Sequence, residues 1–343
     1  MKAIVYAAHG GPEVLQYKDV PEPQIGPYEV SVRVRACALN HLDIWLRMGL
    51  PGTHVPLPHI PGSDIAGEVA RIGDKVTNVK VGERVLLQPG ISCSQCDKCL
   101  CGQDSMCAAY TLFGEGVDGG CAEFVKSPAV NCVPVPEKLS FEEAAAFPLV
   151  SLTAWHMLIG RARLQPAETV LVLGAGSGVG SAAIQIAKAA GARVIATAGS
   201  DAKLEKAREL GADAVINHSS QKIADEVKRL TNRRGVEVVF EHVGQATWEN
   251  SIRSLAVGGR LITCGATTGF NGAINIAYLF TRQLSILGSF MGSKAELFSA
   301  LELLRRGLLK PVIDVVLPLE ECAEAHKRME SREIFGKIVL RVD

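Results

Sequence analysis

Residues 168–288 alternate short apolar runs with helical patterns, and this rhythm restricts the possible fold more than any other feature. The six runs are continuous rather than alternating: TVLVLG, ARVIATA, DAVIN, VEVVFEHV, RLITCGA and LSILGS. Such runs are typical of parallel strands that helices cover on both faces. Between two of them, SDAKLEKAREL begins at a candidate N-cap, Ser200, and ends at Gly211. The pattern predicts an α/β domain with a doubly wound parallel sheet.

The chain up to about residue 150 has a different pattern, typical of a mostly antiparallel β domain. In EVSVRVRACA, apolar residues alternate with polar or charged ones, which indicates a half-exposed sheet. After residue 292 come a helical segment and the strand FGKIVLRV, which we expect to rejoin this first domain. The predicted division is therefore 1–152 with 293–343, and 153–292. Two domains also suit 343 residues, since one core usually stops growing at ~250–300 residues.

The charge balance and the apolar segments exclude several classes of partner. Lys+Arg and Asp+Glu number 36 each, so no basic excess predicts nucleic acid or an anionic membrane surface. The longest apolar region, AAAFPLVSLTAWHMLIG, is interrupted by Pro148, Ser151 and His156 and falls short of a membrane span. The N-terminal apolar stretch is too short for a signal peptide. We expect a cytoplasmic protein with a small-molecule partner.

The segment VLVLGAGSGVGSAAIQIAKAAGARVIATAGS reads as strand, glycine-rich loop, helix and strand. Glycines let the backbone approach a pyrophosphate, whose charge the amides and dipole of the helix start favour. The spacing departs from G-x-G-x-x-G because Val179 takes the place of the third glycine, and the loop ends one residue later. The alternative is a tight strand-to-helix turn. Within this strand and helix pattern we predict a Rossmann nucleotide domain, with the cofactor held by Gly174, Gly176, Ser177, Gly178, Val179 and Gly180.

The end of the second strand bears on the choice of nucleotide. An NAD site places an acidic residue ~20 residues after the glycines to hold the ribose hydroxyls. This chain has no acid at residues 197–200, and Ser200 and Lys203 could donate to a 2′-phosphate. Lys203 could equally be a solvated helix lysine, and Asp201 weakens its field. The pattern favours NADPH, with NADH as the alternative.

Five of the ten cysteines lie within CSQCDKCLCGQDSMC. Cys93, Cys96, Cys99 and Cys107 are spaced as C-x2-C-x2-C-x7-C, a set that suits tetrahedral Zn²⁺. Four protein ligands leave no position for water or substrate, so we predict one structural zinc ion per chain. Disulfides are disfavoured in a reducing compartment, and an iron–sulfur cluster has no redox partner motif.

Four landmarks in order resemble the medium-chain dehydrogenase/reductase superfamily over essentially the full length: PGSDIAGEV, the four-cysteine segment, GAGSGVGSAAIQIAKAAGA and FGKIVL. The resemblance implies a GroES-like catalytic domain beside the Rossmann domain. Zinc alcohol dehydrogenases of that superfamily carry a second, catalytic zinc, and their motif positions can be located here. The ligand positions fall on Asn40, Ser63 and Leu149, the proton-relay position on Leu42, and the motif glutamate on Asp64. Asn, Ser and Leu cannot rebuild a shell of thiolate and imidazole.

This loss of ligands is similar to that in the zinc-independent quinone oxidoreductases and enone reductases of the superfamily. The resemblance implies an NAD(P)H-dependent oxidoreductase, which reduces quinones or α,β-unsaturated carbonyls with NADPH by metal-independent hydride transfer. It also implies that Asn40 donates a hydrogen bond in the nicotinamide cleft, that Trp45 forms a wall and that Asp43 lies close by. Trp45 could instead be core, and Asp43 could cap a helix. The four-cysteine segment is commoner among the alcohol dehydrogenases.

Further cofactor contacts are expected from the resemblance, mostly at strand ends. They are Thr153, Gly178, Val179, Lys203, His218, Val243, Gly244, Cys264, Gly265, Ala266 and Ser289. The superfamily and a possible open strand edge at LSILGSFMG imply a homodimer or homotetramer. Two other interpretations stay open: an alcohol dehydrogenase with an atypical metal site at His41, His59 and Asp64, and an NADPH-binding structural protein with little turnover.

Overall fold

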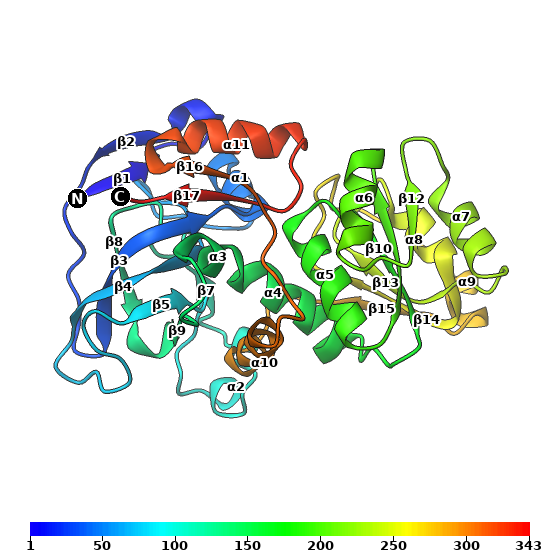
Figure 1. Ribbon diagram of the computed structural model, residues 1–343, viewed down its shortest axis with the longest axis horizontal. Coiled ribbons are helices and arrows are strands. Elements are labelled where there is room, and N and C mark those ends of the chain that lie inside the picture. Colours follow the sequence, from blue (N-terminus) through cyan, green and yellow to red (C-terminus); the bar gives the residue numbers. More distant parts are fainter. The chain divides into compact units, whose positions relative to one another are not determined.

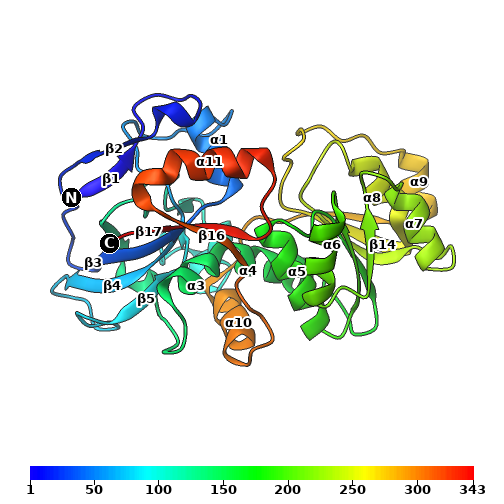
Figure 2. The same ribbon diagram turned by 45° about the horizontal axis from the view of Figure 1, so that its top comes forward.

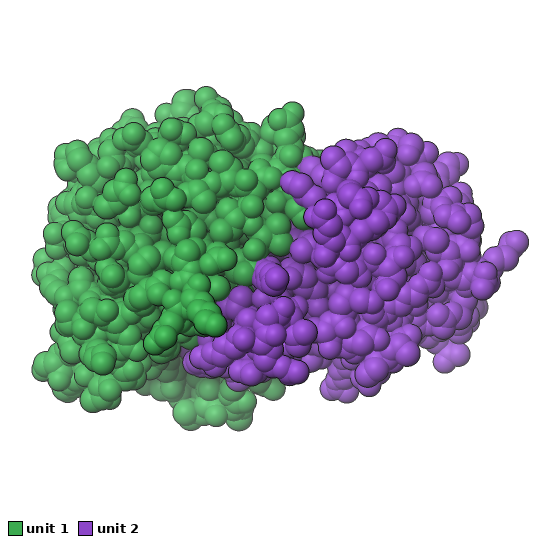
Figure 3. All heavy atoms as spheres, in the orientation of Figure 1, with its two compact units in different colours: residues 1–149, 311–343 green, residues 150–310 purple.

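The computed structural model describes residues 1–343 and divides into two compact units (Figure 3). Unit 1 is Met1–Leu149 with Pro311–Asp343, and unit 2 is Val150–Lys310. The second boundary differs from the expected 292/293, because helix α10 (Lys294–Arg305) belongs to unit 2. Its Glu296 accepts a hydrogen bond from His156 Nδ1 at 2.8 Å, and Lys310 N donates to Gln185 Oε1 at 2.9 Å. These bonds hold the helix and the segment after it to unit 2.

Unit 2 contains a six-stranded parallel sheet (Figure 1), and the six expected strands are confirmed. Its strands lie in the order β12-β11-β10-β13-β14-β15. In chain order they are β10 (Thr169–Val172), β11 (Arg193–Ala198), β12 (Ala214–Asn217), β13 (Val236–Glu241), β14 (Leu255–Thr263) and β15 (Ser285–Gly288). The direction of strand succession reverses between β10 and β13, which makes this point the switch at which such sheets bind ligands. The predicted doubly wound sheet is thus confirmed.

Helices cover both faces of this sheet. Figures 1 and 2 show α5 (Gly178–Ala189) and α6 (Asp201–Glu209) on one side, and α7 (Ile223–Leu230), α8 (Trp248–Ser254) and α9 (Ile276–Thr281) on the other. Four of them turn buried apolar residues inward, as α7 does with Ile223 and Val227, whereas α9 has no buried residue. Helix α4 (Pro148–Trp155) continues into a π-helical segment, η4 (His156–Arg161).

Unit 1 is built on a seven-stranded sheet in the order β16-β17-β3-β4-β5-β9, with β8 also paired to β3. The strands are β3 (Glu29–Ala38), β4 (Asp64–Ile72), β5 (Arg84–Leu87), β8 (Phe124–Pro128), β9 (Cys132–Pro134), β16 (Ile313–Pro318) and β17 (Lys337–Arg341). Pairing is antiparallel except between β16 and β17. The mostly antiparallel domain and the return of the tail to it agree with the sequence pattern. On the polar side of the alternating pattern of β3, Arg33 is exposed as expected, whereas Ser31 is buried.

Smaller elements complete unit 1 around this sheet. A hairpin of β1 (Lys2–Val5) and β2 (Gln16–Asp19) and the short pair β6 (Gly90–Ile91) and β7 (Thr111–Leu112) are separate from it. Its helices are α1 (His41–Met48), α2 (Asp97–Leu100), α3 (Phe141–Ala146) and α11 (Cys322–Ser331), with short 3-10 turns between elements. No helix in the chain has both the length and the apolarity that crossing a membrane requires.

Three strand ends meet at one point of the unit 1 sheet. Ala38 near the end of β3 pairs with Asp64, the first residue of β4, and also with Val339 of β17. Leu39 N donates to Ile338 O at 2.9 Å, which extends the pairing with β17 past the end of β3. The register thus brings Asn40, Asp64 and Lys337 together, although they are far apart in the sequence.

Candidate functional site

The glycine loop between β10 and α5 has the geometry of an anion site. Gly174 has φ +59°, the left-handed region that favours glycine. A Cβ at Gly180 would lie 2.4 Å from Gly174 O, so the helix can start this close to the strand only with glycine there. Ser177 caps α5, because its Oγ accepts from Gly180 N at 2.9 Å. The amides of Gly178 and Val179 open the helix, where N–H groups lack intrahelical acceptors and are available to an anion.

Two side chains that the sequence analysis missed, the half-buried His242 and the buried Glu241, hold this loop and its neighbour. His242 Nε2 donates to Leu173 O at 2.8 Å, and burial lowers the pKa of His242, which disfavours the charged form of its ring. The Glu241 carboxylate accepts from Val243 N at 2.6 Å, Gly244 N at 3.0 Å and Ser251 Oγ at 2.5 Å. The sequence signal that could have identified these two residues is their position at the end of a predicted parallel strand. Both side chains support the backbone that surrounds the predicted nucleotide site.

The predicted cofactor contacts fall mostly after the carboxyl ends of strands near the switch point. A Cβ at Gly244 would lie 2.8 Å from Ala266 Cα, so the loops after β13 and β14 pack closely. Ser289 N donates to Thr263 O at 2.9 Å, which ties the end of β15 to β14. Thr153 lies buried in α4, with Oγ1 3.9 Å from Met291 Sδ. The segments thus joined around the strand ends contain Val243, Gly244, Cys264, Gly265, Ala266 and Ser289.

A second group of predicted contacts lies after β11 and β12. Ser200 precedes α6 and is exposed, and its side chain makes no capping bond. A Cβ at Gly199 would lie 3.1 Å from His218 Nε2, and burial, with a smaller contribution from the Lys203 charge, lowers the pKa of His218. The Asp201 carboxylate accepts from Asn217 Nδ2 at 2.8 Å. Ser200, Lys203 and His218 therefore form a polar group in which the one nearby acid is already engaged.

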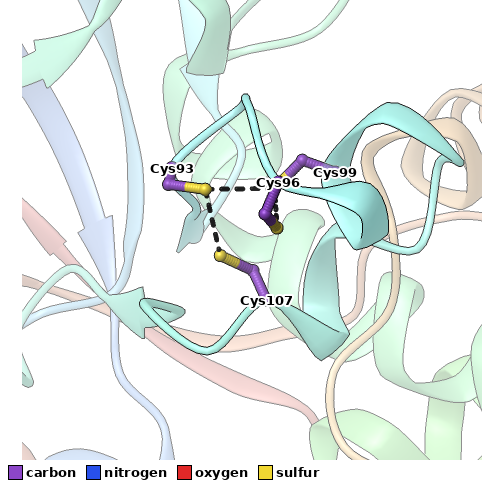
Figure 4. Close-up of side chains that lie close together, drawn as sticks. All are labelled: Cys93, Cys96, Cys99 and Cys107. Carbon is purple, nitrogen blue, oxygen red and sulfur yellow. Dashed lines mark hydrogen bonds between the residues drawn. The ribbon is translucent and has the colours of Figure 1, made fainter.

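Four cysteines are gathered in a short lobe of unit 1 (Figure 4). The Sγ atoms of Cys93, Cys96, Cys99 and Cys107 all lie within 4.8 Å of one another. Three of the separations are 3.5, 3.5 and 3.9 Å, close to the about 3.8 Å between thiolates that bind one zinc tetrahedrally. The backbone amides of Gln95 and Cys96 lower the pKa of Cys93 to about 6, which favours the thiolate. The donor set and its spacing fit zinc, and the four ligands would complete its shell.

The place expected for a catalytic zinc holds a different set of groups. Lys337 Nζ donates to Asn40 Oδ1 at 2.6 Å and to Asp64 Oδ2 at 2.8 Å. Asn40 Nδ2 also donates to Asp64 Oδ2, at 2.9 Å, and Leu149 N donates to Asp64 Oδ1 at 2.8 Å. Ser63 Oγ donates to Phe113 O at 2.7 Å and is fully buried. These donors do not fit a zinc ion, because they offer neither thiolate nor imidazole and include an ammonium.

The other residues predicted around this point have distinct surroundings. Asp43 is buried and accepts from Asn40 N at 2.7 Å and Gly62 N at 3.0 Å, which completes the capping box of α1. Burial raises the pKa of Asp43. Trp45 is half-buried on α1, 6.2 Å from the His41 ring. Asp43 thus supports the backbone of Asn40 rather than standing free.

The alternative metal site at His41, His59 and Asp64 is not assembled. The four cysteines are the only group of three or more His, Cys, Asp or Glu residues close enough to share an ion. His59 is buried, with Nδ1 3.7 Å from Asp118 Oδ1 and Nε2 without a hydrogen-bond partner. Burial also lowers the pKa of His59.

Comparisons with known proteins match a family model to a segment of each unit. The family described as "Alcohol dehydrogenase GroES-like domain" matches residues 26–137, and "Zinc-binding dehydrogenase" matches residues 178–306. The chain is 35% identical to an alcohol dehydrogenase of Geobacillus stearothermophilus, over 100% of both chains. It is 33% identical to a quinone oxidoreductase of Rattus norvegicus, over 99% of this chain and 97% of the relative. A crystal structure described as an NAD-dependent alcohol dehydrogenase superposes with TM-score 0.97 at 49% identity, over 100% of both chains.

The chain belongs to the medium-chain dehydrogenase/reductase superfamily of zinc-type alcohol dehydrogenase-like proteins. Within it, the chain is an NAD(P)-dependent oxidoreductase, as the sequence analysis expected. By name, its relatives include both alcohol dehydrogenases and quinone oxidoreductases.

Proposed function

We propose that the protein is an NADPH-dependent reductase of quinones or α,β-unsaturated carbonyl compounds, and that its hydride transfer uses no metal ion. The observation that carries this proposal is the closed set of hydrogen bonds among Asn40, Asp64 and Lys337, where a catalytic zinc would need thiolate and imidazole ligands. The similarity to a quinone oxidoreductase supports the same reaction class.

The chemistry explains why such a site suits a conjugated acceptor. Reduction of an isolated ketone concentrates negative charge on one alkoxide oxygen, which in zinc enzymes the metal stabilises. In an enone, hydride adds to the β-carbon, the electron pair of the double bond moves toward oxygen, and an enolate forms. Water then protonates the α-carbon. A quinone accepts hydride and a proton to give a hydroquinone, so hydrogen bonds at the oxygen can suffice.

We assign roles to the three predicted catalytic residues on this basis. Asn40 donates a hydrogen bond from Nδ2 to the substrate oxygen. Trp45 forms an apolar wall for the ring or the double bond. Asp43 holds the backbone of Asn40 through its amide, at 2.7 Å. NADPH is the cofactor, with its 2′-phosphate at Ser200, Lys203 and His218, because no carboxylate follows β11 directly. The four cysteines hold a structural zinc.

The proposal is tested by following NADPH oxidation with a naphthoquinone, a 2-alkenal and the matching saturated aldehyde, with zinc content measured on the same protein. We expect turnover with the first two substrates, insensitivity to a chelator, and one zinc per chain. Turnover only with the saturated aldehyde or an alcohol, or two zinc ions per chain, would show an alcohol dehydrogenase instead. Tight NADPH binding without turnover would favour the structural protein.

We also propose that the chain assembles as a homodimer through β15, as an isolated pair or as half of a tetramer. Strand β15 is an outer strand of its sheet, so one edge has no partner within the chain. Phe280 and Phe290, which flank this strand, are 66% and 58% exposed. Light scattering should give twice or four times the mass of the chain, and a monomer would contradict the proposal.

A further inference from the structure

The orientation of the Asn40 amide is fixed by the chemistry of its two neighbours. An ammonium can only donate hydrogen bonds, and a carboxylate can only accept them. Asn40 Oδ1 therefore faces Lys337 Nζ, at 2.6 Å, and Asn40 Nδ2 faces Asp64 Oδ2, at 2.9 Å. A flipped amide would place its NH₂ group against the ammonium and its oxygen against the carboxylate. The assignment of oxygen and nitrogen, often ambiguous for asparagine, is thus determined here.

One N–H of Asn40 remains without a good acceptor inside the chain. Of the two hydrogens on Nδ2, one lies toward Asp64 and the other has only Ala38 O, at 3.5 Å. That distance exceeds the about 2.7–3.2 Å of ordinary N–H···O bonds. Asn40 is 8% exposed, so this donor lies in a poorly solvated place where a hydrogen bond to a developing negative charge is strong.

Lys337 also supplies the positive charge at this point. Its side chain is 3% exposed and that of Asp64 is not exposed at all, so each is the counter-ion that the other needs. No other cationic side chain bonds to Asn40 or Asp64. The backbone side of Asn40 is held by the Asp43 carboxylate, which accepts from Asn40 N. The amide is thus fixed from both ends.

We propose that Lys337 is the positioning residue of the reductase site: it fixes Asn40 so that the amide presents N–H rather than C=O to the substrate oxygen, and its ammonium takes the electrostatic place of the absent metal centre. The inference rests on the proposed function and adds to it a residue that acts through Asn40.

The test compares turnover in variants that remove one or both charges of the Lys337 and Asp64 pair. Lys337→Met alone leaves a buried carboxylate unpaired, so Lys337→Met/Asp64→Asn is made as well, because it removes both charges. Arg341→Met is the matched control: it lies on the same strand, and its ion pair with Glu142 is exposed. We expect kcat with the naphthoquinone to fall on the order of 10- to 100-fold in the double variant, with KM for NADPH unchanged and the control within about twofold of wild type.

A double-mutant cycle separates positioning from a structural role. If Lys337 acts through Asn40, adding Lys337→Met/Asp64→Asn to Asn40→Ala should lower kcat by less than about threefold further. A double variant with wild-type kcat, or effects that multiply in full, would overturn the inference. The wild-type assay is separate: absence of quinone and enal turnover in wild type would refute the proposed function alone.

The amide orientation has a readout that needs no turnover. In wild type we expect the two Asn40 side-chain amide protons to be widely separated in a ¹⁵N-correlated NMR spectrum and to exchange slowly with water. The signals are assigned by their loss in Asn40→Ala. In Lys337→Met/Asp64→Asn they should move together and exchange faster, whereas in Arg341→Met they should not change. Unchanged Asn40 signals in the double variant would overturn the inference whether or not the enzyme turns over.

Discussion

Removal of one member of the Lys337 and Asp64 pair should destabilise unit 1 far more than removal of a surface ion pair. Their side chains are 3% and 0% exposed, and Nζ lies 2.8 Å from Oδ2. Without Lys337, the Asp64 carboxylate keeps only neutral donors, Asn40 Nδ2 and Leu149 N. An uncompensated buried charge costs about 3–5 kcal/mol, so Lys337→Met and Asp64→Asn should each lower the free energy of unfolding by about that amount.

The double variant should be more stable than either single variant. Lys337→Met/Asp64→Asn leaves no buried charge, and its remaining cost is one or two imperfect polar contacts, about 1–3 kcal/mol. The two changes therefore interact by several kcal/mol, which is the sign expected of a buried pair. Arg341→Met, which breaks the exposed pair with Glu142, should cost less than about 1 kcal/mol.

Urea unfolding followed by tryptophan fluorescence measures these differences in unit 1 alone. Trp45 is the one tryptophan of unit 1, since Trp155 and Trp248 lie in unit 2. The variants are therefore made in a Trp155→Phe/Trp248→Phe background. If each single variant loses less than about 1 kcal/mol, or if the double variant is the least stable, the reasoning about a buried ion pair is refuted.

Three further perturbations test the other parts of the site. Cys107→Ser should lower the zinc content measured by elemental analysis well below one ion per chain. Cys101 is exposed and outside the four-cysteine group, so Cys101→Ser should leave the zinc content unchanged. Equal zinc content in the two variants would contradict the four-cysteine site. Gly180→Ala should weaken NADPH binding in calorimetry by at least about tenfold, because its Cβ would lie 2.4 Å from Gly174 O. Gly288→Ala should bind NADPH as wild type does, because nothing lies within 4 Å of a Cβ at Gly288. Equal affinities of the two variants would be inconsistent with a close strand-to-helix turn. Burial lowers the pKa of His242, so the native state resists a proton that the unfolded chain accepts below about pH 6.5. The stability of unit 2 should therefore fall by up to about 1.4 kcal/mol per pH unit on further acidification. A flat profile from Trp155 and Trp248 emission in a Trp45→Phe background would refute this.

Local patterns in the sequence predicted most of the architecture. Continuous apolar runs such as TVLVLG are typical of strands that are covered on both faces, and six of them separated by helical patterns predicted the sheet of unit 2. The spacing of Cys93 to Cys107 likewise predicted that these cysteines gather in one lobe, because they are close in sequence. The second unit boundary was not predictable from pattern, since the bonds that hold α10 to unit 2 join Glu296 to His156, 140 residues apart.

The contacts around Asn40 could not be predicted from the sequence. The motif positions showed that the metal ligands are missing, but nothing local indicated what replaces them. Lys337 lies 297 residues from Asn40 and 273 from Asp64, so only the register of β17 against β3 reveals the contact. Asp43 was correctly weighed as a possible cap, because an acid three residues after an asparagine at a helix start is a local signal.

The order of strands in unit 1 has a consequence for the synthesis of the protein. Strand β17 lies between β16 and β3, yet the ribosome makes it only after all of unit 2. During elongation, the edge of β3 that β17 will cover is open and the Asp64 carboxylate has no counter-ion, while unit 2 can already fold. The parallel sheet of unit 2 can therefore be complete before Asn40, Asp64 and Lys337 come together. Residues 311–343 then supply the strands that close the sheet and the lysine that completes this cluster.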